Sequence, residues 1–525
     1  MADKAKFQAI KGVRDILPQE SALWSHVEQT AREAFGTFGF AEIRLPVVEP
    51  TELFDRSIGG ETDIVSKEMY KIEDKLRSLR HSIIVDTELL SLQKEISTSQ
   101  VTEILASLMV FLKFAREALE SKELSSEHRK VINDLDSLCT TNMNRLVHGD
   151  PIGEAERKKL RSAVSELISQ VEVEDISLRP EATASVVRAY IEHGMQVQPG
   201  NVKLYYMGPM FRRERPQKGR YRQFYQIGAE VLGTSDAPGI DAEVIEMLMT
   251  LFERLKLKGT ILNINSIGDK NCRPAYVEKL RAELQKVREQ LGADSQRRIE
   301  TNPLRVLDSK LEHEQAIIEK LPRIGENLCD ECRAHYAEVK RQLDMRGIRY
   351  QENWRLVRGL DYYMRTTFEI TAPGLGSQNA VCGGGRYDGL VELLGGPAAT
   401  KGIGFAIGTD RLILSLQEAG EGAASGGPAG KAAGPDVYLA WFGAAAQTAA
   451  IGLAKRLRDA GFVVELPAVE MKFGKSLGLA DRLRARHAVI VGDDELAAGI
   501  VTVKRLSDGA QQKLAEPGLM LYLRA

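Results

Sequence analysis

Apolar side chains recur along the chain at helical and strand spacings, which predict alternating helices and strands. A helical pattern covers 21–38, and the run Ile43-Arg-Leu-Pro-Val-Val predicts a short strand interrupted by proline. Strands and helices should alternate from 176 to about 265. Residues 266–350 are charged and predicted to be rich in helix, and 355–415 should return to strands joined by glycine-rich turns.

The pattern changes over 75–173, where apolar residues follow heptad-like spacings. The stripes are Val101, Leu105, Leu108, Leu112, Ala115 and Leu119; then Val131, Leu135 and Leu138; then Leu160, Val164 and Leu167. The segment His148-Gly-Asp-Pro-Ile-Gly predicts a turn between the second and third stripes. We expect a small helical bundle here.

A third change of composition comes near the end of the chain. Residues 419–435 are rich in glycine and alanine, as in a flexible linker. After them, the apolar runs Val437-Tyr-Leu-Ala-Trp and Ala488-Val-Ile-Val alternate with helical runs. This pattern predicts a compact α/β domain over 436–525.

Length and composition indicate a globular protein of several domains. The 525 residues suggest roughly three or four domains, and 43% hydrophobic with 27% charged residues is an ordinary balance. No apolar run approaches the roughly 20 residues that span a bilayer, and the first residues lack the apolar stretch of a secretory signal. Five cysteines, an odd number, favour a reducing compartment. We therefore expect a cytoplasmic protein without membrane contacts.

The net charge of −2 does not indicate a nucleic-acid partner, so such a partner would need a local basic patch. One patch lies between Arg212 and Arg222, where six basic residues accompany one acid. Pro216 and Gly219 lie within it and strand-like runs flank it, which predicts a hairpin. The segment could be a solvated loop or a site at which arginines bind phosphate.

This segment, Phe211-Arg-Arg-Glu-Arg-Pro-Gln-Lys-Gly-Arg-Tyr-Arg-Gln-Phe, resembles motif 2 of class II aminoacyl-tRNA synthetases, in the form found in the histidyl-tRNA synthetase family. Further stretches resemble the family in the same order. They are Lys11-Gly-Val-Arg-Asp-Ile-Leu-Pro, Glu42-Ile-Arg-Leu-Pro-Val-Val-Glu-Pro (motif 1), Leu178-Arg-Pro-Glu-Ala-Thr-Ala-Ser, Leu356-Val-Arg-Gly-Leu-Asp-Tyr-Tyr, Gly383-Gly-Gly-Arg-Tyr-Asp-Gly-Leu and Gly402-Ile-Gly-Phe-Ala-Ile-Gly-Thr-Asp-Arg-Leu (motif 3). Only 75–173 lies outside the resemblance.

The resemblance implies an α/β protein, more closely α+β, whose catalytic core is an antiparallel sheet flanked by helices. The core would comprise 1–74, 174–265 and 349–418, with a helical insertion at 75–173 and a helix-rich family insertion at 266–348. A linker at 419–435 would lead to an anticodon-binding domain at 436–525. The match to motif 1 implies a homodimer.

The resemblance also implies an activity, the ATP-dependent activation of L-histidine and its transfer to the 3′ end of tRNA(His). Arg212 and Arg411 would hold the phosphates of ATP, and Arg358 would contact both the histidine carboxylate and the α-phosphate. Cations fixed in place suit a reaction that concentrates negative charge on phosphorus. The implied cofactors are ATP and Mg²⁺. Each arginine alone would more often form a surface ion pair.

The amino-acid pocket implied by the resemblance reads the imidazole with Glu230 and Tyr363, with Tyr387 beside them. Glu181, Thr183 and Gln226 would hold the α-amino group. Without the resemblance, the two tyrosines would be read as core residues, and glycines 383–385 as either a β-turn or a close-approach surface.

Contacts with tRNA are expected in two places. Gln217, Lys218 and Arg220 would meet the acceptor end, and residues 436–525 would meet the anticodon. The latter segment carries twelve Lys/Arg and ten Asp/Glu, a net charge of +2 that does not by itself indicate nucleic acid.

The cysteines allow one alternative. Cys329-Asp-Glu-Cys332 is a C-x-x-C pair, with His335 three residues later and Cys272 upstream, so a structural zinc site is conceivable. No second C-x-x-C accompanies it, and the family needs no metal there. We expect a reduced, incidental pair and no bound metal.

The insertion at 75–173 separates Glu73-Asp74 from Asp175-Ile-Ser-Leu, which look like the two sides of one short turn. It could be a surface appendage or a surface that contacts tRNA or a partner. A different overall function is also considered, that of a catalytically inactive, histidine-sensing regulatory paralogue. Such paralogues typically lack both the tail domain and the signature containing Arg358, which this chain has.

Overall fold

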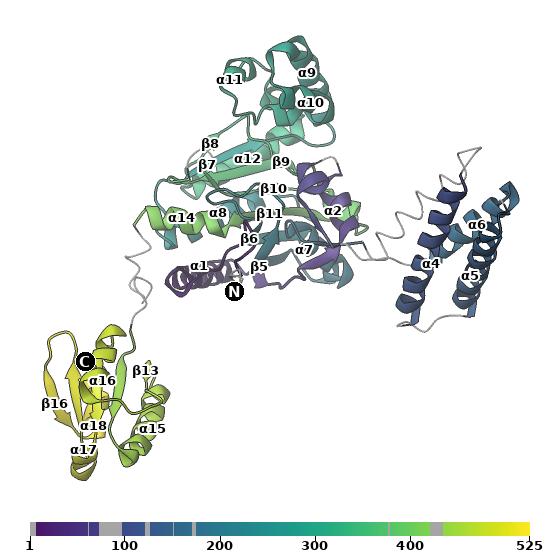
Figure 1. Cartoon of the computed structure of the whole chain (residues 1–525). Helices are drawn as coiled ribbons and strands as arrows, with labels where there is room; N and C mark the ends of the chain where they lie inside the picture. Colours follow the sequence, from purple (N-terminus) through teal and green to yellow (C-terminus); the bar gives the residue numbers. More distant parts are fainter. Residues whose placement is uncertain are drawn as a thin grey trace. The chain divides into compact units, whose positions relative to one another are not determined.

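The chain divides into two compact units, which are Met1–Arg14 with Thr30–Leu414 and Asp15–Gln29 with Ser415–Ala525. Figure 1 draws the helices and strands of the chain with the labels used below. The computed structural model describes residues 7–60, 62–72, 97–120, 126–150, 152–170, 175–375, 379–420 and 434–524. Within these residues, no helix combines the length and apolar character that a membrane span requires. Most of the predicted linker 419–435 lies outside the described residues.

The first unit is built on an eight-stranded sheet, in the order β1-β5-β6-β11-β10-β9-β7-β8. All neighbours are antiparallel except the end pairs β1–β5 and β7–β8. The strands are β1 (Ala41–Glu42), β5 (Val202–Phe211), β6 (Gln223–Gly233), β7 (Ile261–Ser266), β8 (Gln351–Glu352), β9 (Met364–Thr371), β10 (Ala380–Arg386) and β11 (Lys401–Gly408). The predicted antiparallel core and the hairpin around 212–222 are both confirmed.

Helices flank this sheet, because consecutive residues of its central strands are buried and both faces therefore need cover. Phe35, in α1 (Pro18–Thr37), packs edge-on against Tyr205 and Phe405 of the sheet. The other helices near the sheet are α2 (Thr51–Ile58), α7 (Thr183–Glu192), α8 (Pro238–Arg254), α13 (Leu390–Leu393) and α14 (Thr409–Glu418). The predicted helix at 21–38 is therefore confirmed.

A small three-stranded sheet, in the order β2-β4-β3, lies beside the main one. Its strands are β2 (Val48–Pro50), β3 (Tyr70–Lys71) and β4 (Ile176–Leu178), and the π-helix η1 (Ile64–Glu68) precedes β3. The strand predicted over 43–48 is wrong for most of its length, because the strands β1 and β2 lie on either side of 43–47. Proline at 46 cannot donate to a strand ladder, and Arg179 instead donates to the carbonyls of Leu45 and Pro46.

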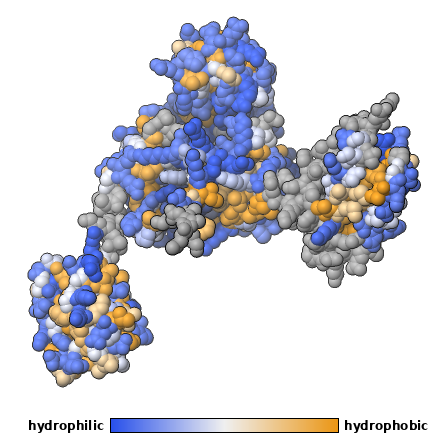
Figure 2. Space-filling view, in the orientation of Figure 1, coloured by the Kyte–Doolittle hydropathy of each residue, from blue (hydrophilic) through white to orange (hydrophobic). Residues whose placement is uncertain are grey.

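Residues 266–348 form the predicted helix-rich region. It contains α9 (Arg273–Lys286), α10 (Ala293–Thr301), α11 (Glu312–Ile318) and α12 (Asp330–Met345), with short 3-10 helices between them. Tyr276, Leu280, Ile299 and Val306 are among the residues of its own apolar core. Hydrophilic residues cover most of the face that Figure 2 shows of the lobe carrying α9, α10 and α11, in keeping with its charged composition.

Three helices occupy the described part of 75–173, which confirms the predicted bundle. They are α4 (Thr98–Glu120), α5 (Ser126–Val147) and α6 (Glu154–Gln170). Leu105, Leu108, Leu135 and Leu160 are among the predicted stripe residues in its buried core, and Ile132 joins them. The side chains of Ala115, Leu119, Val131 and Leu167 lie outside the described residues.

The insertion begins after one strand of a hairpin, β3, and ends before the other, β4. Tyr70 pairs with Leu178 and Lys71 with Ser177, and the amide of Ile72 donates to the carbonyl of Ile176 at 2.9 Å. The two sides of the predicted turn are thus held together by backbone hydrogen bonds, although Glu73 and Asp74 lie outside the described residues. The bundle is inserted at a position where a short turn would suffice.

Residues 436–524 form a five-stranded sheet in the order β13-β12-β14-β15-β16. The strands are β12 (Val437–Trp441), β13 (Val464–Glu465), β14 (His487–Val491), β15 (Val501–Arg505) and β16 (Gln511–Leu514). They pack with α15 (Ala444–Asp459), α16 (Phe473–Arg482), α17 (Asp493–Ala498) and α18 (Glu516–Arg524) around buried aliphatic side chains. The α/β fold predicted for this segment is confirmed.

The hairpin predicts that 73–174 can be replaced by Asn-Gly, which with Asp175 forms a three-residue loop between Ile72 and Ile176, without loss of the fold. The β3–β4 pairing would remain, and closing a shorter loop costs no more entropy than closing the long one. We expect the shortened chain to keep the thermal unfolding midpoint of the rest of the protein, measured by circular dichroism. A control deletion that also removes Ile176–Leu178 should lower that midpoint strongly, and equal losses in both variants would contradict the prediction.

Candidate active site

The predicted site residues gather around one cavity in the first unit. Eight of them line it: Glu181, Thr183, Arg212, Arg220, Gln226, Arg358, Tyr363 and Arg411. Glu230 and Tyr387 are buried directly behind Thr183. Gln217 and Lys218 lie apart, in a shallow depression shared with Gly12 and Arg14. Most of the residues predicted from the sequence therefore belong to one pocket, and two residues of the 212–222 loop lie outside it.

The carboxyl group of Glu230 is the most enclosed polar group of the site. Glu230 comes from β6 and is 1% exposed. Its Oε1 accepts a hydrogen bond from Thr183 Oγ1 at 2.7 Å, and its Oε2 accepts one from Tyr387 OH at 2.6 Å. Burial raises the pKa of Glu230 to about 8, although both hydroxyl donors oppose the shift.

Glycines make the space that this arrangement needs. Gly404 of β11 is paired with Glu230, and a Cβ on Gly404 would lie 1.6 Å from Glu230 Oε2. A Cβ on Gly383 of β10 would lie 2.1 Å from a guanidinium nitrogen of Arg358. Glycines 383–385 are thus part of a central strand, so the β-turn alternative is wrong and the close-approach alternative is correct.

Glu181 and Gln226 supply polar atoms on the cavity wall. The carboxylate of Glu181 accepts from the backbone amides of Thr183 at 2.7 Å and Ala184 at 2.9 Å. These bonds fix Glu181 at the start of α7, while burial raises its pKa. Gln226 Oε1 is buried and has no hydrogen-bond partner among the described residues, so it can accept one from a bound molecule.

Two of the three arginines are held by backbone carbonyls. Arg212 Nε donates to the carbonyl of Pro180 at 3.0 Å, and its guanidinium lies over the ring of Phe224. Arg411 donates to the carbonyls of Gly219 at 3.1 Å and Ala380 at 2.9 Å. Carbonyls orient a guanidinium without neutralising it, although Arg212 Nη1 also lies 3.8 Å from Glu214 Oε1. Burial lowers the pKa of Arg411, and the nearby Arg220 adds to this.

Arg358 is fixed by an acid and by aromatic packing. Its Nη1 lies 3.0 Å from Glu369 Oε2, and its guanidinium lies over the ring of Tyr363 with 6.0 Å to the centroid. Burial raises the pKa of Tyr363 to about 12, so its hydroxyl keeps its proton at neutral pH and can donate. Arg358 and Tyr363 thus lie side by side on the cavity wall.

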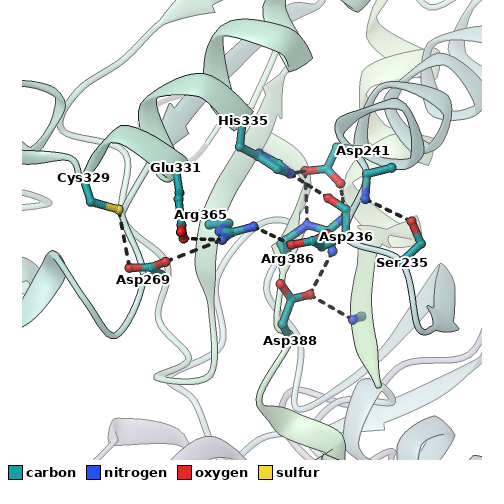
Figure 3. Close-up of polar contacts among 12 residues, drawn as sticks. Ser235, Asp236, Asp241, Asp269, Cys329, Glu331, His335, Arg365, Arg386 and Asp388 are labelled. Carbon is teal, nitrogen blue, oxygen red and sulfur yellow. Dashed lines mark hydrogen bonds and ion pairs between the residues drawn. The ribbon is translucent and has the colours of Figure 1, made fainter. Parts of the chain in front are cut away.

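A buried ion cluster supports the strand end that carries Tyr387. Arg386 is 1% exposed, contacts Asp241 of α8, and donates to Asp388 Oδ1 at 2.8 Å (Figure 3). Asp388 also accepts from the amide of Gly402 at 3.2 Å. These contacts fix β10 against α8 and β11, which determines where the hydroxyl of Tyr387 meets Glu230.

The structure adds cavity residues that the sequence did not indicate, notably Glu214, Tyr225, Tyr362 and Glu369. Glu369 lies on β9 and is paired with Gly383 in the sheet. Glu369 is the one acid on β9, and an acid on a central strand is a usable signal because central strands rarely carry unpaired charge. Only the strand pairing, which brings Glu369 next to Arg358, shows that this acid belongs to the cavity.

Known proteins resemble this chain along its length. A family model described as histidyl-tRNA synthetase matches residues 146–412, and one described as anticodon binding domain matches 436–524. A histidine–tRNA ligase of Koribacter versatilis is 44% identical over 524 residues, covering 98% of this chain and 96% of the relative. One of Solibacter usitatus is 42% identical over 518 residues, covering 99% of each.

Solved structures agree with these matches. The crystal structure of apo S. aureus histidyl-tRNA synthetase aligns with a TM-score of 0.67 at 30% identity, covering 99% of this chain and 100% of that chain. With the antiparallel sheet and the arginine-lined cavity, this defines an aminoacyl-tRNA synthetase of class II. The chain belongs to the histidyl-tRNA synthetase family.

The raised pKa of Glu230 predicts a pH-dependent loss of stability. The unfolded carboxyl loses its proton near pH 4.5 and the folded one near pH 8. Between these values the folded state binds more protons, so stability falls as the pH rises, by at most about 1.4 kcal/mol per pH unit. Glu230→Gln removes the titration while keeping an acceptor and a donor.

We therefore expect the thermal unfolding midpoint of Glu230→Gln to fall less than that of the parent between pH 5 and pH 8. Glu392→Gln, at an exposed position of α13, serves as the control and should keep the parent's slope. Parallel slopes for the parent and Glu230→Gln would show that the buried carboxyl does not titrate in this range.

Proposed function

We propose that this chain is a histidine–tRNA ligase, which activates L-histidine with ATP and transfers the histidyl group to the 3′ end of tRNA(His). The observation that carries this proposal is the buried Glu230 carboxyl, hydrogen-bonded to Thr183 and Tyr387 behind a cavity whose wall holds Arg212, Arg358 and Arg411. Membership of the histidyl-tRNA synthetase family and the names of the relatives support it.

Activation requires a carboxylate to approach a polyanion. A histidine carboxylate oxygen attacks the α-phosphorus of ATP, and the bond from that phosphorus to the oxygen of the β-phosphate breaks. Pyrophosphate leaves with the electron pair, and histidyl-adenylate remains. In the second step the terminal hydroxyl of tRNA attacks the carbonyl carbon of the adenylate, a proton is released, and AMP leaves.

The arginines suit the first step because their positions are set before substrate binds. Arg212 and Arg411 are oriented by carbonyls and would hold ATP phosphates. Arg358 would contact the histidine carboxylate and the α-phosphate together. A fixed cation stabilises the growing negative charge without the reorganisation that water requires.

Selection of histidine would rest on hydrogen bonds to the imidazole. A neutral imidazole has one donor and one acceptor nitrogen, and Glu230 and Tyr363 would meet them. Tyr387 holds the Glu230 carboxyl, while Glu181, Thr183 and Gln226 would bind the α-amino group. Amino acids without a matching donor and acceptor would leave these buried groups unpaired, which disfavours them strongly.

Mg²⁺ is proposed as the metal that accompanies ATP. It usually binds through one or two carboxylates and the substrate phosphates, and it offsets phosphate charge. Glu369 supplies one carboxylate at the cavity, next to Arg358.

The contacts with tRNA are proposed on two surfaces. Gln217, Lys218 and Arg220 lie at the tip of the 212–222 loop, where Gln217 and Arg220 pair through their backbones and Gly219 has φ +72°. The acceptor end would meet this tip, and 436–525 would meet the anticodon, as the match to an anticodon binding domain supports.

The oligomeric state and the domain boundaries are proposed from the same resemblance. We propose a cytoplasmic homodimer, supported by the resemblance of Glu42–Pro50 to motif 1. The catalytic core would comprise 1–74, 174–265 and 349–418, interrupted by 75–173 and 266–348. The linker 419–435 would connect it to the anticodon-binding domain.

Exchange of labelled pyrophosphate into ATP tests the proposed reaction directly. We expect exchange with histidine and none above background with the other nineteen amino acids, since only histidine satisfies the buried pair Glu230 and Tyr363. Histidine binding without any exchange would instead indicate the inactive, histidine-sensing paralogue. Exchange supported by another amino acid would contradict the pocket assignment.

Replacement of Arg358 by alanine tests the catalytic cation. We expect Arg358→Ala to slow histidine-dependent exchange by about a hundredfold or more, because a fixed charge is lost from the transition state. Arg358→Lys should recover part of the rate, since it keeps the charge but loses the planar fork. Arg341→Ala, which removes an exposed arginine of α12 paired with Glu338, is the control and should leave the rate unchanged. Unchanged exchange in Arg358→Ala would remove that residue from the mechanism.

A further inference from the structure

Four potential metal ligands converge where two helices of the 266–348 region begin. They are Asp269 and Cys272, just before α9, and Cys329 and Cys332, at the start of α12. One oxygen and three sulfur atoms lie within 4.8 Å of one another. Asp269, Cys272 and Cys332 are buried, and Cys329 is half-buried. The sequence showed one C-x-x-C pair, and the fold supplies the second pair as D-x-x-C.

The separations are close to those of a tetrahedral zinc site. With Zn–S bonds of about 2.3 Å, two sulfur ligands of one ion lie roughly 3.8 Å apart. Cys272 Sγ lies 3.6 Å from Asp269 Oδ1, and Cys329 Sγ lies 4.0 Å from the same oxygen. All four ligand atoms lie within 4.8 Å of one another, so a modest contraction of the cluster would let them share an ion.

The backbone at Asp269–Cys272 holds two of the potential ligand atoms close together. Gly268 has φ +66°, and a Cβ there would lie 2.7 Å from Cys272 Sγ, so the turn requires glycine. The amide of Asp269 points at Cys272 Sγ at 3.5 Å, and the amide of Asn271 donates to Asp269 Oδ1 at 2.9 Å. Amides directed at a ligand sulfur and a ligand carboxylate hold both in place and stabilise their charged forms.

The surroundings supply a second layer of contacts. Arg365 Nη2 lies 3.6 Å from Asp269 Oδ2, and its Nη1 donates to Asp236 at 2.8 Å (Figure 3). His335, considered above as a possible ligand, belongs elsewhere. Its Nε2 contacts the carbonyl of Asp236 at 3.0 Å and lies 3.8 Å from Asp241. The ligand set is therefore three cysteines and one aspartate.

We propose that Asp269, Cys272, Cys329 and Cys332 bind one structural Zn²⁺ ion. Binding would release the three thiol protons to solvent, and the guanidinium of Arg365 would offset part of the remaining negative charge. Four protein ligands close the coordination shell and leave no position for water or substrate, which is typical of structural rather than catalytic zinc.

The ion would also support the active-site cavity, because residues next to its ligands contact the segment that carries Tyr363. Arg365, the second residue of β9, has φ +50°, and its amide donates to the carbonyl of Gly268 at 2.7 Å. Arg273, next to Cys272, donates from Nη1 to the carbonyl of Tyr363 at 2.5 Å. The ion would join the starts of α9 and α12 and brace the segment that carries Tyr363 into the cavity.

Metal content of the full-length protein tests the proposal. Protein produced in zinc-supplemented medium and purified without chelators should contain about one equivalent of Zn²⁺ per chain by mass spectrometry. Its removal with a chelator should lower the thermal unfolding midpoint by several degrees. Replacement by Co²⁺ should produce the intense visible absorption of a tetrahedral site and sulfur-to-cobalt charge transfer in the near ultraviolet.

Substitutions make the assignment specific. Cys329→Ala should lose the bound zinc, whereas Cys139→Ala, which removes a buried cysteine of the α4–α6 bundle, should retain it. Asp269→Cys completes a four-cysteine set and should release zinc to a competing chelator at least about tenfold more slowly than the parent, because thiolate is the softer ligand. This variant keeps the test informative if Cys329→Ala unfolds.

Two results would overturn the proposal. One is less than a tenth of an equivalent of zinc in both the parent and Asp269→Cys after exposure to Zn²⁺ under reducing conditions. The other is a thiol count under denaturing, non-reducing conditions that finds three of the five cysteines reactive in freshly purified protein, since this would show a disulfide in place of the ion. Five reactive thiols in the presence of a chelator are expected.

Discussion

The catalytic unit is organised around one buried carboxyl group. Glu230 can occupy the centre of the sheet only because Gly404, its neighbour on β11, has no side chain, and because Thr183 and Tyr387 each donate a hydrogen bond to it. An unpaired carboxyl in this position would cost several kcal/mol. The requirement for these donors determines where α7 begins and how β10 ends. It thereby also places Glu181 and Arg386, which lie next to the two donors in the fold.

Electrostatic order extends outward from that carboxyl. Arg386 is held by two aspartates at the end of β10, whereas Arg212 and Arg411 are held mainly by carbonyls at the cavity. The first arrangement neutralises its cation and fixes the sheet. The second orients its cations at the cavity. Arg358 combines the two arrangements, because its partner is an acid, Glu369, and both residues line the cavity.

Much of this could be predicted from the sequence, for reasons that particular residues make clear. The hairpin at 212–222 and the stripe through Leu105 and Leu108 depend on local periodicity, which a single sequence displays directly. The strand expected at 43–48 failed because Arg179, far along the chain, captures the carbonyls that a ladder would use. Glu369 and Asp269 were likewise not predicted as site residues. Their partners are set by sheet register and helix packing, which no local pattern contains.

The hairpin between β3 and β4 determines where residues can be inserted into this chain. Its two strands are about 4.8 Å apart and already joined by backbone hydrogen bonds, so a short connection is enough to link their ends. Any domain whose own ends lie near each other can be carried there without shifting the register of the catalytic sheet. The end of this hairpin, after Ile72, is therefore a natural graft point, where a reporter or a binding module can be attached to the enzyme.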